Sequence, residues 1–190
     1  MTYPNWFALT AEENFAEYLD EYKGQKNLRF LQIGTFTGDA SVWLAQNVLT
    51  NKTSTMYDVD TWQGSKEEAH ESMDFADVEQ TYDKKVKPYH NIKKYKMTSE
   101  YYLLTQTAKS FDFIYIDGDH TAAGVLADAV SGWRCLKPGG IMAFDDYTWT
   151  HPDGELYTPQ PAINFFAWSH QNELNVLEYN SQFWVRKNDN

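Results

Sequence analysis

A short apolar and aromatic stretch, Phe111 to Ile116, most constrains what this chain can fold into. Its sequence is FDFIYI, and such a run is typical of a strand buried on both faces of a sheet. Sheets that are covered on both faces are mostly parallel, with helices packed on each side. The stretch therefore predicts an α/β domain in which parallel strands alternate with helices.

Charged side chains follow this strand at once, because the next residues include Asp117, Asp119 and His120. The next apolar strand along the chain ends in the same way, in Asp145 and Asp146. In open α/β sheets the ligand crevice lies at the carboxyl ends of the strands, so these groups are expected to share one edge. Such a concentration of carboxylates predicts a divalent cation. The alternative is that each acid only caps the segment that follows it.

The remaining elements are expected from periodicity and from glycine and proline positions. Strands are expected at 28–33, 53–59, 92–97 and 140–144, helices at 39–49, from 98, at 121–136 and from 163, and an antiparallel hairpin at 174–186. A turn is expected at 137–140 and an irregular loop around Pro159 to Pro161. A capping box at Thr10 to Glu13 predicts a helix within residues 1–26, and residues 62–90 form a polar segment that is either a lid or a solvated helix pair. Together these elements predict one domain, residues 1–190.

A glycine turn, Gly34 to Gly38, joins the first expected strand to its helix. Glycines permit a tight turn and close approach to a ligand, and a helix amino terminus offers N–H groups to an anion. The spacing G-x-x-x-G differs from the G-x-G-x-x-G of dinucleotide binders. Asp60, at the end of the second strand, is placed to accept hydrogen bonds from a ribose, and Asp58 is the second choice.

Composition excludes several classes of protein. Acidic residues outnumber basic ones 27 to 16, for a formal charge of −11, so nucleic acid is not an expected partner. Cys135 is the only cysteine, which rules out an internal disulfide. No apolar stretch is long enough for a membrane span, and no secretory signal is evident, so we expect a cytoplasmic protein. We expect its partner to be a small molecule. A homodimer is left open.

Four segments in order resemble the motifs of class I S-adenosylmethionine-dependent methyltransferases. They are Leu31 to Gly38, Asp60 to Trp62, Phe111 to His120 and Leu136 to Tyr147. Within that class the chain resembles the metal-dependent small-molecule O-methyltransferases, such as macrocin O-methyltransferase and its relatives. The resemblance implies a single-domain Rossmann-like methyltransferase fold, with a seven-stranded, mostly parallel sheet whose last strand is antiparallel and with helices on both faces.

The resemblance also implies roles for individual residues. S-adenosylmethionine would be bound by Gln32, Gly34, Thr35, Phe36, Gly38, Asp60, Thr98 and Asp117, with Met97 to Ser99 at the edge of its adenine. Mg²⁺ or a similar divalent cation would be held by Asp117, Asp145 and Asp146. Gln32 departs from the pattern, since relatives usually have an acid there; an amide can still donate and accept hydrogen bonds.

The expected reaction is O-methylation of a small-molecule hydroxyl, assisted by the metal. Either Asp119 or His120 would take the proton, and His151 is a further candidate because it follows the acid pair. Three rivals stay open: a module that binds the cofactor without catalysis, a metal-independent methyltransferase, and a D-x-D nucleotide-sugar glycosyltransferase. The acceptor cannot be named from the sequence, and a sugar hydroxyl, a phenol or another polar metabolite would fit.

Overall fold

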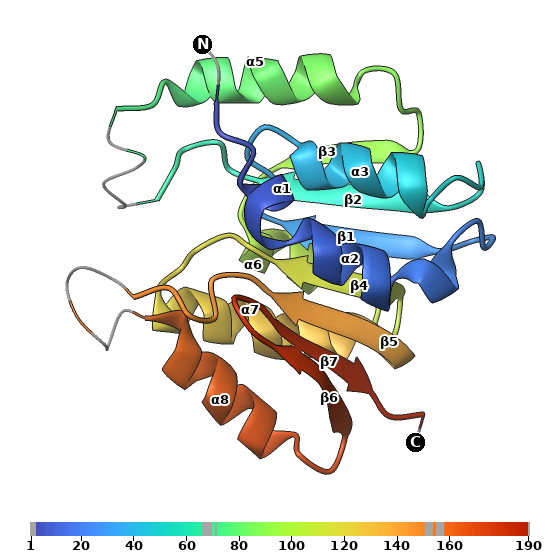
Figure 1. The fold of residues 1–190 in the computed structure, drawn as a ribbon, viewed down its shortest axis with the longest axis vertical. Coiled ribbons are helices and arrows are strands. Elements are labelled where there is room, and N and C mark those ends of the chain that lie inside the picture. The colour runs from blue at the N-terminus through green and yellow to red at the C-terminus, as the bar shows by residue number, and fades with distance from the viewer. Residues whose placement is uncertain (1–2, 66–69, 71, 151–153, 155–157, 190) are drawn as a thin grey trace.

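The computed structural model describes residues 3–65, 70, 72–150, 154 and 158–189. The described chain forms one seven-stranded sheet in the order β3-β2-β1-β4-β5-β7-β6 (Figure 1). Its strands are β1 (Arg29–Ile33), β2 (Thr55–Asp60), β3 (Ile92–Lys96), β4 (Phe111–Ile116), β5 (Leu136–Phe144), β6 (Leu174–Tyr179) and β7 (Phe183–Lys187). The pairs among β1 to β5 are parallel, and β7 runs antiparallel to both β5 and β6. The fold class expected from the sequence is confirmed.

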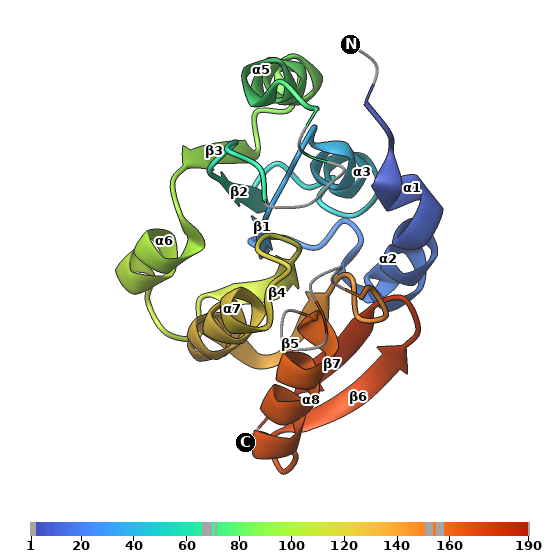
Figure 2. The same cartoon turned by 90° about the vertical axis from the view of Figure 1, so that its left-hand side faces the viewer.

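Helices cover both faces of this sheet. They are α1 (Trp6–Thr10), α2 (Glu12–Tyr18), α3 (Asp39–Asn47), α5 (Phe75–Val86), α6 (Ser99–Thr105), α7 (Ala122–Cys135) and α8 (Pro159–Ser169), with a short 3-10 helix η1 at Asp20–Tyr22. Figure 2 shows α1, α2 and α3 on one side and α6, α7 and α8 on the other, with α5 beyond the β3 end. The result is a three-layer α/β/α domain.

The central strand β4 supplies side chains to the core on both faces, as its composition predicts. Ile114 and Ile116 belong to the apolar cluster under α6, α7 and α8. Phe113 and Tyr115 belong to the cluster under α1, α2 and α3. All four side chains are almost completely buried, so the alternation of a strand divides them between two cores.

Three local expectations are wrong. Thr10 does not cap a helix but ends α1, where its Oγ1 donates to the carbonyl of Trp6, and α2 begins at Glu12 without a side-chain cap. Pro159 lies in the first turn of α8 instead of in a loop, since a first turn needs no N–H donor there. The expected turn at 137–140 lies within β5, whose pairing with β4 shifts register between Phe111 and Phe113.

The described part of the polar segment 62–90 has an apolar core of its own. Val78 and Tyr82 of α5 are fully buried and pack with Trp62. Lys85 on the same helix forms an ion pair with Asp39 at the start of α3, with a distance of 2.7 Å between Nζ and Oδ1. The ion pair docks α5 against the start of α3, and the apolar contact docks it against the segment that follows β2. Movement of residues 62–90 as a lid stays a prediction.

Close approach of two backbones fixes the geometry where β1 and β4 end. Gly34 has φ +78°, and a Cβ built on it would lie 1.8 Å from the carbonyl oxygen of Asp117 and 2.7 Å from the Cα of Gly118. These contacts are with backbone, which cannot move aside as a flexible side chain would. Only glycine fits at this position.

We expect Gly34→Ala to lower the free energy of unfolding by at least about 3 kcal/mol, because it combines a left-handed backbone with a backbone clash. Gly24→Ala is the matched control, since Gly24 also has a positive φ, of +72°, but its Cβ would meet only Thr50 Oγ1 at 3.6 Å. The loss of stability in this control measures the cost of the left-handed backbone alone, which we expect to be about 1 kcal/mol. Urea denaturation of the two variants measures both; equal losses would show that the close approach at Gly34 carries no cost.

Candidate functional site

The candidate site is a cavity of about 320 Å³ at the carboxyl ends of the central strands. Its walls include side chains that follow β1, β4 and β5. The strand order reverses at β1 and β4, because β1 leads outward to β2 whereas β4 leads outward to β5. Ligands of open α/β sheets bind at such a switch point. The position of the cavity is therefore the one that the fold favours for a ligand.

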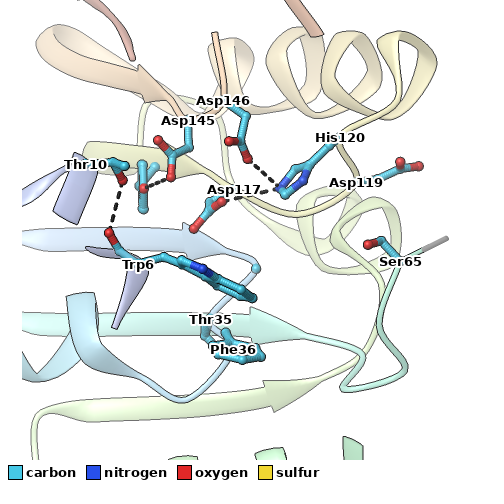
Figure 3. A network of polar contacts seen from close by, with 12 residues as sticks. Trp6, Thr10, Thr35, Phe36, Ser65, Asp117, Asp119, His120, Asp145 and Asp146 are labelled. Atoms are coloured by element: carbon cyan, nitrogen blue, oxygen red, sulfur yellow. Dashed lines mark hydrogen bonds and ion pairs between the residues drawn. The ribbon is translucent and has the colours of Figure 1, made fainter. Parts of the chain in front are cut away.

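One wall of the cavity brings together Asp117, His120 and Asp146. His120 Nε2 lies 3.4 Å from Asp117 Oδ1 and 3.2 Å from Asp146 Oδ2, so the imidazole sits between the two carboxylates (Figure 3). One ligand atom from each residue lies within 4.8 Å of the others. Asp146 has φ +53°, a left-handed conformation that aspartate tolerates better than most residues. These three residues, which we call the Asp/His/Asp cluster, could hold a metal ion.

Asp145 also lines the cavity, but its carboxylate has other partners. The hydroxyl of Tyr115 donates to Oδ2 at 2.7 Å, and Gln182 Nε2 donates to Oδ1 at 3.0 Å. Gln182 is itself fixed, because its Oε1 accepts from Asn14 Nδ2 and from Trp184 Nε1, each at 2.9 Å. The structure thus brings Asp145 to the cavity while holding both of its oxygens by a donor from β4 and a donor that directly precedes β7.

Burial and neighbouring charge set the electrostatics of this wall. Burial, and then the charge of Asp145, raise the pKa of Asp117 well above its usual range, although contact with His120 lowers it. Burial likewise raises the pKa of Tyr115, with the charges of Asp117 and Asp145 adding to the effect. Tyr115 therefore stays protonated and remains a hydrogen-bond donor to Asp145.

Asp119 is turned away from the cavity. Its Oδ1 accepts from the backbone N–H of Thr121 at 2.9 Å, just before α7 begins at Ala122. A Cβ built on Gly124 would lie 2.4 Å from Asp119 Oδ2, so the carboxylate packs against the first turn of this helix. Figure 3 shows Asp119 directed away from Asp117 and His120. Of the two residues expected to compete for the proton, only His120 lies on the cavity wall.

The glycine turn forms a second wall of the same cavity. Gln32, Thr35, Phe36 and Thr37 all line it. Gln32 is buried, its Nε2 donates to the carbonyl of Gly34 at 2.9 Å, and its Oε1 accepts from a hydroxyl on α3. The amide therefore supports the turn as donor and acceptor at once, which a carboxylate could not do.

Asp60 supports the turn from the other side. Its Oδ2 accepts from the backbone N–H of Thr35 at 2.7 Å and of Phe36 at 3.0 Å, and its Oδ1 accepts from the N–H of Trp62 at 2.7 Å. Phe36 has φ +47°, an uncommon conformation for an aromatic residue, and these bonds hold it there. Asp60 does not itself line the cavity, so its contact with a ribose stays a prediction.

Other residues expected at the site lie elsewhere. Thr98 caps α6, accepting from the N–H of Tyr101 at 3.4 Å, and neither Thr98 nor Met97 lines the cavity. Asp58 is fully buried beneath α5, where the hydroxyl of Tyr82 donates to its Oδ2 at 2.7 Å. His151 lies outside the described residues.

Aromatic side chains form the outer part of the cavity and were not expected there from the sequence. The rings of Trp6 and Phe36 are 4.8 Å apart, and those of Phe36 and His70 stack at 6.2 Å. Trp149 lies 5.8 Å from the ring of His120. The only sequence signal was the high aromatic content of 16%, which does not show where the rings lie.

The chain belongs to the family described as methyltransferase domain, whose profile matches residues 31–147, more than half of the sequence. It is thus a class I S-adenosylmethionine-dependent methyltransferase. This family match leaves the nucleotide-sugar glycosyltransferase interpretation without support. Among curated protein sequences nothing matches the chain significantly.

Solved structures share the fold at low sequence identity. A methyltransferase described as putative, from Streptococcus mutans, in complex with SAH, is 14% identical with a TM-score of 0.66 and covers 98% of this chain and 99% of its own. The O-methyltransferase TomG from Streptomyces achromogenes, in complex with SAM, is 14% identical with a TM-score of 0.60, over 84% of this chain and 73% of its own. MycE, a methyltransferase of the mycinamycin biosynthetic pathway in complex with Mg and SAH, is 17% identical with a TM-score of 0.64, over 99% of this chain and 51% of its own.

None of the helices in the described residues is both long and apolar enough to span a membrane.

Asp58 gives a pH prediction. Burial raises its pKa to about 7, although the hydrogen bond from the hydroxyl of Tyr82 lowers it. A carboxyl whose pKa is higher in the folded chain binds more protons there, so stability is lost as pH rises from the unfolded pKa through the folded one. We expect the free energy of unfolding to fall by about 2–3 kcal/mol more in the parent than in Asp58→Asn between about pH 5 and pH 8.

The asparagine variant is a suitable comparison because an amide oxygen can still accept from Tyr82. Urea denaturation of both proteins at each pH gives, for each protein, the slope of the free energy of unfolding against pH. Parallel slopes would show that Asp58 is already ionised in the folded protein at the lower pH.

Proposed function

We propose that this protein transfers a methyl group from S-adenosylmethionine to a hydroxyl of a small molecule, with help from a divalent cation. One observation carries the proposal. A single cavity joins the glycine turn, through Gln32 and Thr35, to the Asp/His/Asp cluster after β4 and β5. A cofactor seated on the turn and an acceptor seated at the cluster would therefore share one enclosed space, as methyl transfer requires.

The residues of the turn fit S-adenosylmethionine. When bound, this cofactor supplies an electrophilic methyl group, whose bond to sulfur breaks as its carbon bonds to the acceptor oxygen. Gln32 and Asp60 hold the turn in shape before any ligand arrives, through bonds to the carbonyl of Gly34 and the N–H groups of Thr35 and Phe36. This preorganisation supports cofactor binding despite the amide at residue 32.

The Asp/His/Asp cluster fits a divalent cation by its donor set. Two carboxylates and one imidazole, with ligand atoms within 4.8 Å of one another, are groups that bind such ions in proteins. The structure of MycE contains Mg, and the chain shares its fold. When bound, the ion supplies Lewis acidity that lowers the pKa of a nearby hydroxyl. Asp117 and Asp146 would hold it, while Asp145 is engaged by Tyr115.

Removal of the acceptor proton falls to a group on the cavity wall. His120 and Asp145 both line the cavity, whereas Asp119 is bonded to Thr121 outside it. Histidine has the intrinsic pKa of a base at neutral pH, and a carboxylate held by two neutral donors is a fixed acceptor. His120 is thus a candidate for two tasks, metal ligand and proton acceptor.

The lining of the cavity favours an acceptor that has a ring and no negative charge. Trp6, Phe36 and Trp149 offer aromatic surface, which binds the flat faces of ligands well. None of the described lining residues is a lysine or an arginine, whereas four are aspartates: Asp39, Asp117, Asp145 and Asp146. Away from the proposed ion, an acceptor carboxylate or phosphate would therefore find no lysine or arginine to pair with and would face like charge.

The metal-assisted function makes a first prediction for catalysis. We expect the purified chain to bind S-adenosylmethionine by calorimetry in the presence of a chelator, and methylation of hydroxylated aromatic acceptors to fall at least about tenfold when the chelator is present. Asp146→Asn should retain cofactor affinity within about twofold but lose most turnover, while Asp119→Asn, which removes a charge that faces α7, should keep turnover. Lack of cofactor binding would refute the methyltransferase, and turnover indifferent to the chelator would refute only the metal.

The acceptor preference can be checked with a matched pair of compounds. Methyl 3,4-dihydroxybenzoate should give a kcat/KM at least about tenfold higher than that of 3,4-dihydroxybenzoate, because only the second carries a carboxylate. Thr10→Arg would place a cation at the cavity wall, where Thr10 lies, and should narrow this ratio. Thr10→Gln is the neutral control of comparable reach. Equal kcat/KM for acid and ester in the parent would contradict the preference.

A further inference from the structure

We infer that His120 is a metal ligand and not the base, and that it makes the site select Co²⁺ over Mg²⁺. The inference rests on the proposed metal-assisted function and adds the kind of ion. It assigns Asp117, His120 and Asp146 as the ligand set, and it leaves Asp145 outside that set.

The spacing of the three ligand atoms supports this assignment. Two atoms bound to one ion at about 2.1 Å are about 3.0–3.4 Å apart when the angle between them is that of octahedral or tetrahedral geometry. His120 Nε2 lies 3.2 Å from Asp146 Oδ2 and 3.4 Å from Asp117 Oδ1. The second of these distances is longer than a usual N–H···O bond, whereas both match neighbouring ligands of one ion.

The backbone around the cluster is rigid enough to hold a fixed ligand geometry. The carbonyl of Asp117 lies against Gly34 so closely that no side chain fits between them. The N–H of Asp117 donates to the carbonyl of Ile33 at 2.8 Å, and the N–H of Asp145 donates to the carbonyl of Ile116 at 2.9 Å. Asp117, and the residue that precedes Asp146, are thus each tied by a backbone hydrogen bond to a neighbouring strand. Ligands that are fixed before binding raise both affinity and selectivity.

Asp145, the adjacent carboxylate, is not part of the group of residues whose ligand atoms lie within 4.8 Å of one another. Both of its oxygens already accept hydrogen bonds, from Tyr115 and from Gln182. Tyr115 is almost fully buried, and its hydroxyl lies 2.7 Å from Oδ2 of Asp145. Asp145 is therefore the carboxylate that faces the cavity without belonging to the ligand set, which makes it the proton acceptor that remains.

The chemistry of the donors gives the selectivity. Mg²⁺ is a hard ion that takes oxygen ligands and dehydrates reluctantly. Imidazole nitrogen suits first-row transition ions, whose affinity for such sites rises from Mn²⁺ to Co²⁺. An imidazole in place of a third oxygen should thus raise the affinity for Co²⁺ far more than that for Mg²⁺.

Calorimetry on the chelator-treated full chain, with S-adenosylhomocysteine present and MgCl₂, MnCl₂ or CoCl₂ titrated separately, tests the inference. We expect the parent to bind Co²⁺ at least about 100-fold more tightly than Mg²⁺. His120→Asn offers an amide oxygen instead of nitrogen and should weaken Co²⁺ about tenfold or more while changing Mg²⁺ less than about threefold. The visible absorption of bound Co²⁺ should shift in this variant, because its nitrogen ligand is lost.

Asp145→Asn is the matched control, since it removes a charge from the residue next to a proposed ligand. It should leave the affinities for all three ions within about threefold of the parent, whereas Asp146→Asn should weaken them by about tenfold or more. An unchanged Co²⁺ to Mg²⁺ ratio in His120→Asn, or an unchanged spectrum, would overturn the inference while leaving a metal-assisted enzyme intact. If Asp145→Asn weakened ion binding as much as Asp146→Asn, Asp145 would be a ligand of the ion and the ligand set inferred here would be wrong. Failure of the parent to bind any of the ions would refute the inference and the metal dependence together, but not the methyltransferase.

Discussion

The close approach of Gly34 to Asp117 and Gly118 is the constraint on which the rest of the site depends. With no side chain at residue 34, the exits of β1 and β4 lie in contact. The turn that follows β1 and the acids that follow β4 consequently open into the same cavity. A bulkier residue would separate the two strand ends, and the glycine turn and the Asp/His/Asp cluster would no longer share a space. The absence of a Cβ at residue 34 thus allows the proposed cofactor site and the proposed metal site to lie in one cavity.

The architecture could be predicted from the sequence because it depends on local patterns. Buried strands such as Phe111 to Ile116 have a composition that is hard to mistake, and acids at strand ends fall at one edge in any parallel sheet. The starts of helices were less predictable, since Thr10 and Pro159 carry signals that occur both at helix starts and in other turns. Patterns that repeat over many residues determined the fold correctly, whereas single-residue signals did not.

The arrangement within the site was predictable only in part. A strand-end position fixes where a Cα lies but not which partner its side chain meets. Asp145 could have been placed by continuing the alternation of β5, since Ala143, two residues earlier, faces the same core as Tyr115, with which it pairs. Its second donor, Gln182, lies too far along the chain for any local pattern to reveal it. Asp60 likewise accepts hydrogen bonds from the backbone N–H groups of Thr35 and Phe36, which lie 25 and 24 positions earlier in the chain and so outside any local pattern.

The hydrogen bonds of Gln182 also determine when the site can form during synthesis of the chain. Gln182 accepts from Asn14, a residue 168 positions earlier, and it directly precedes β7, the seventh strand. A nascent chain could pair β1 to β5 and bring Asp117, Asp145 and Asp146 to one edge before β7 has left the ribosome. Asp145, however, would lack one of its two donors until the hairpin closes. The full set of hydrogen bonds to Asp145 thus depends on contacts between residues distant in sequence, and contacts of this kind slow folding.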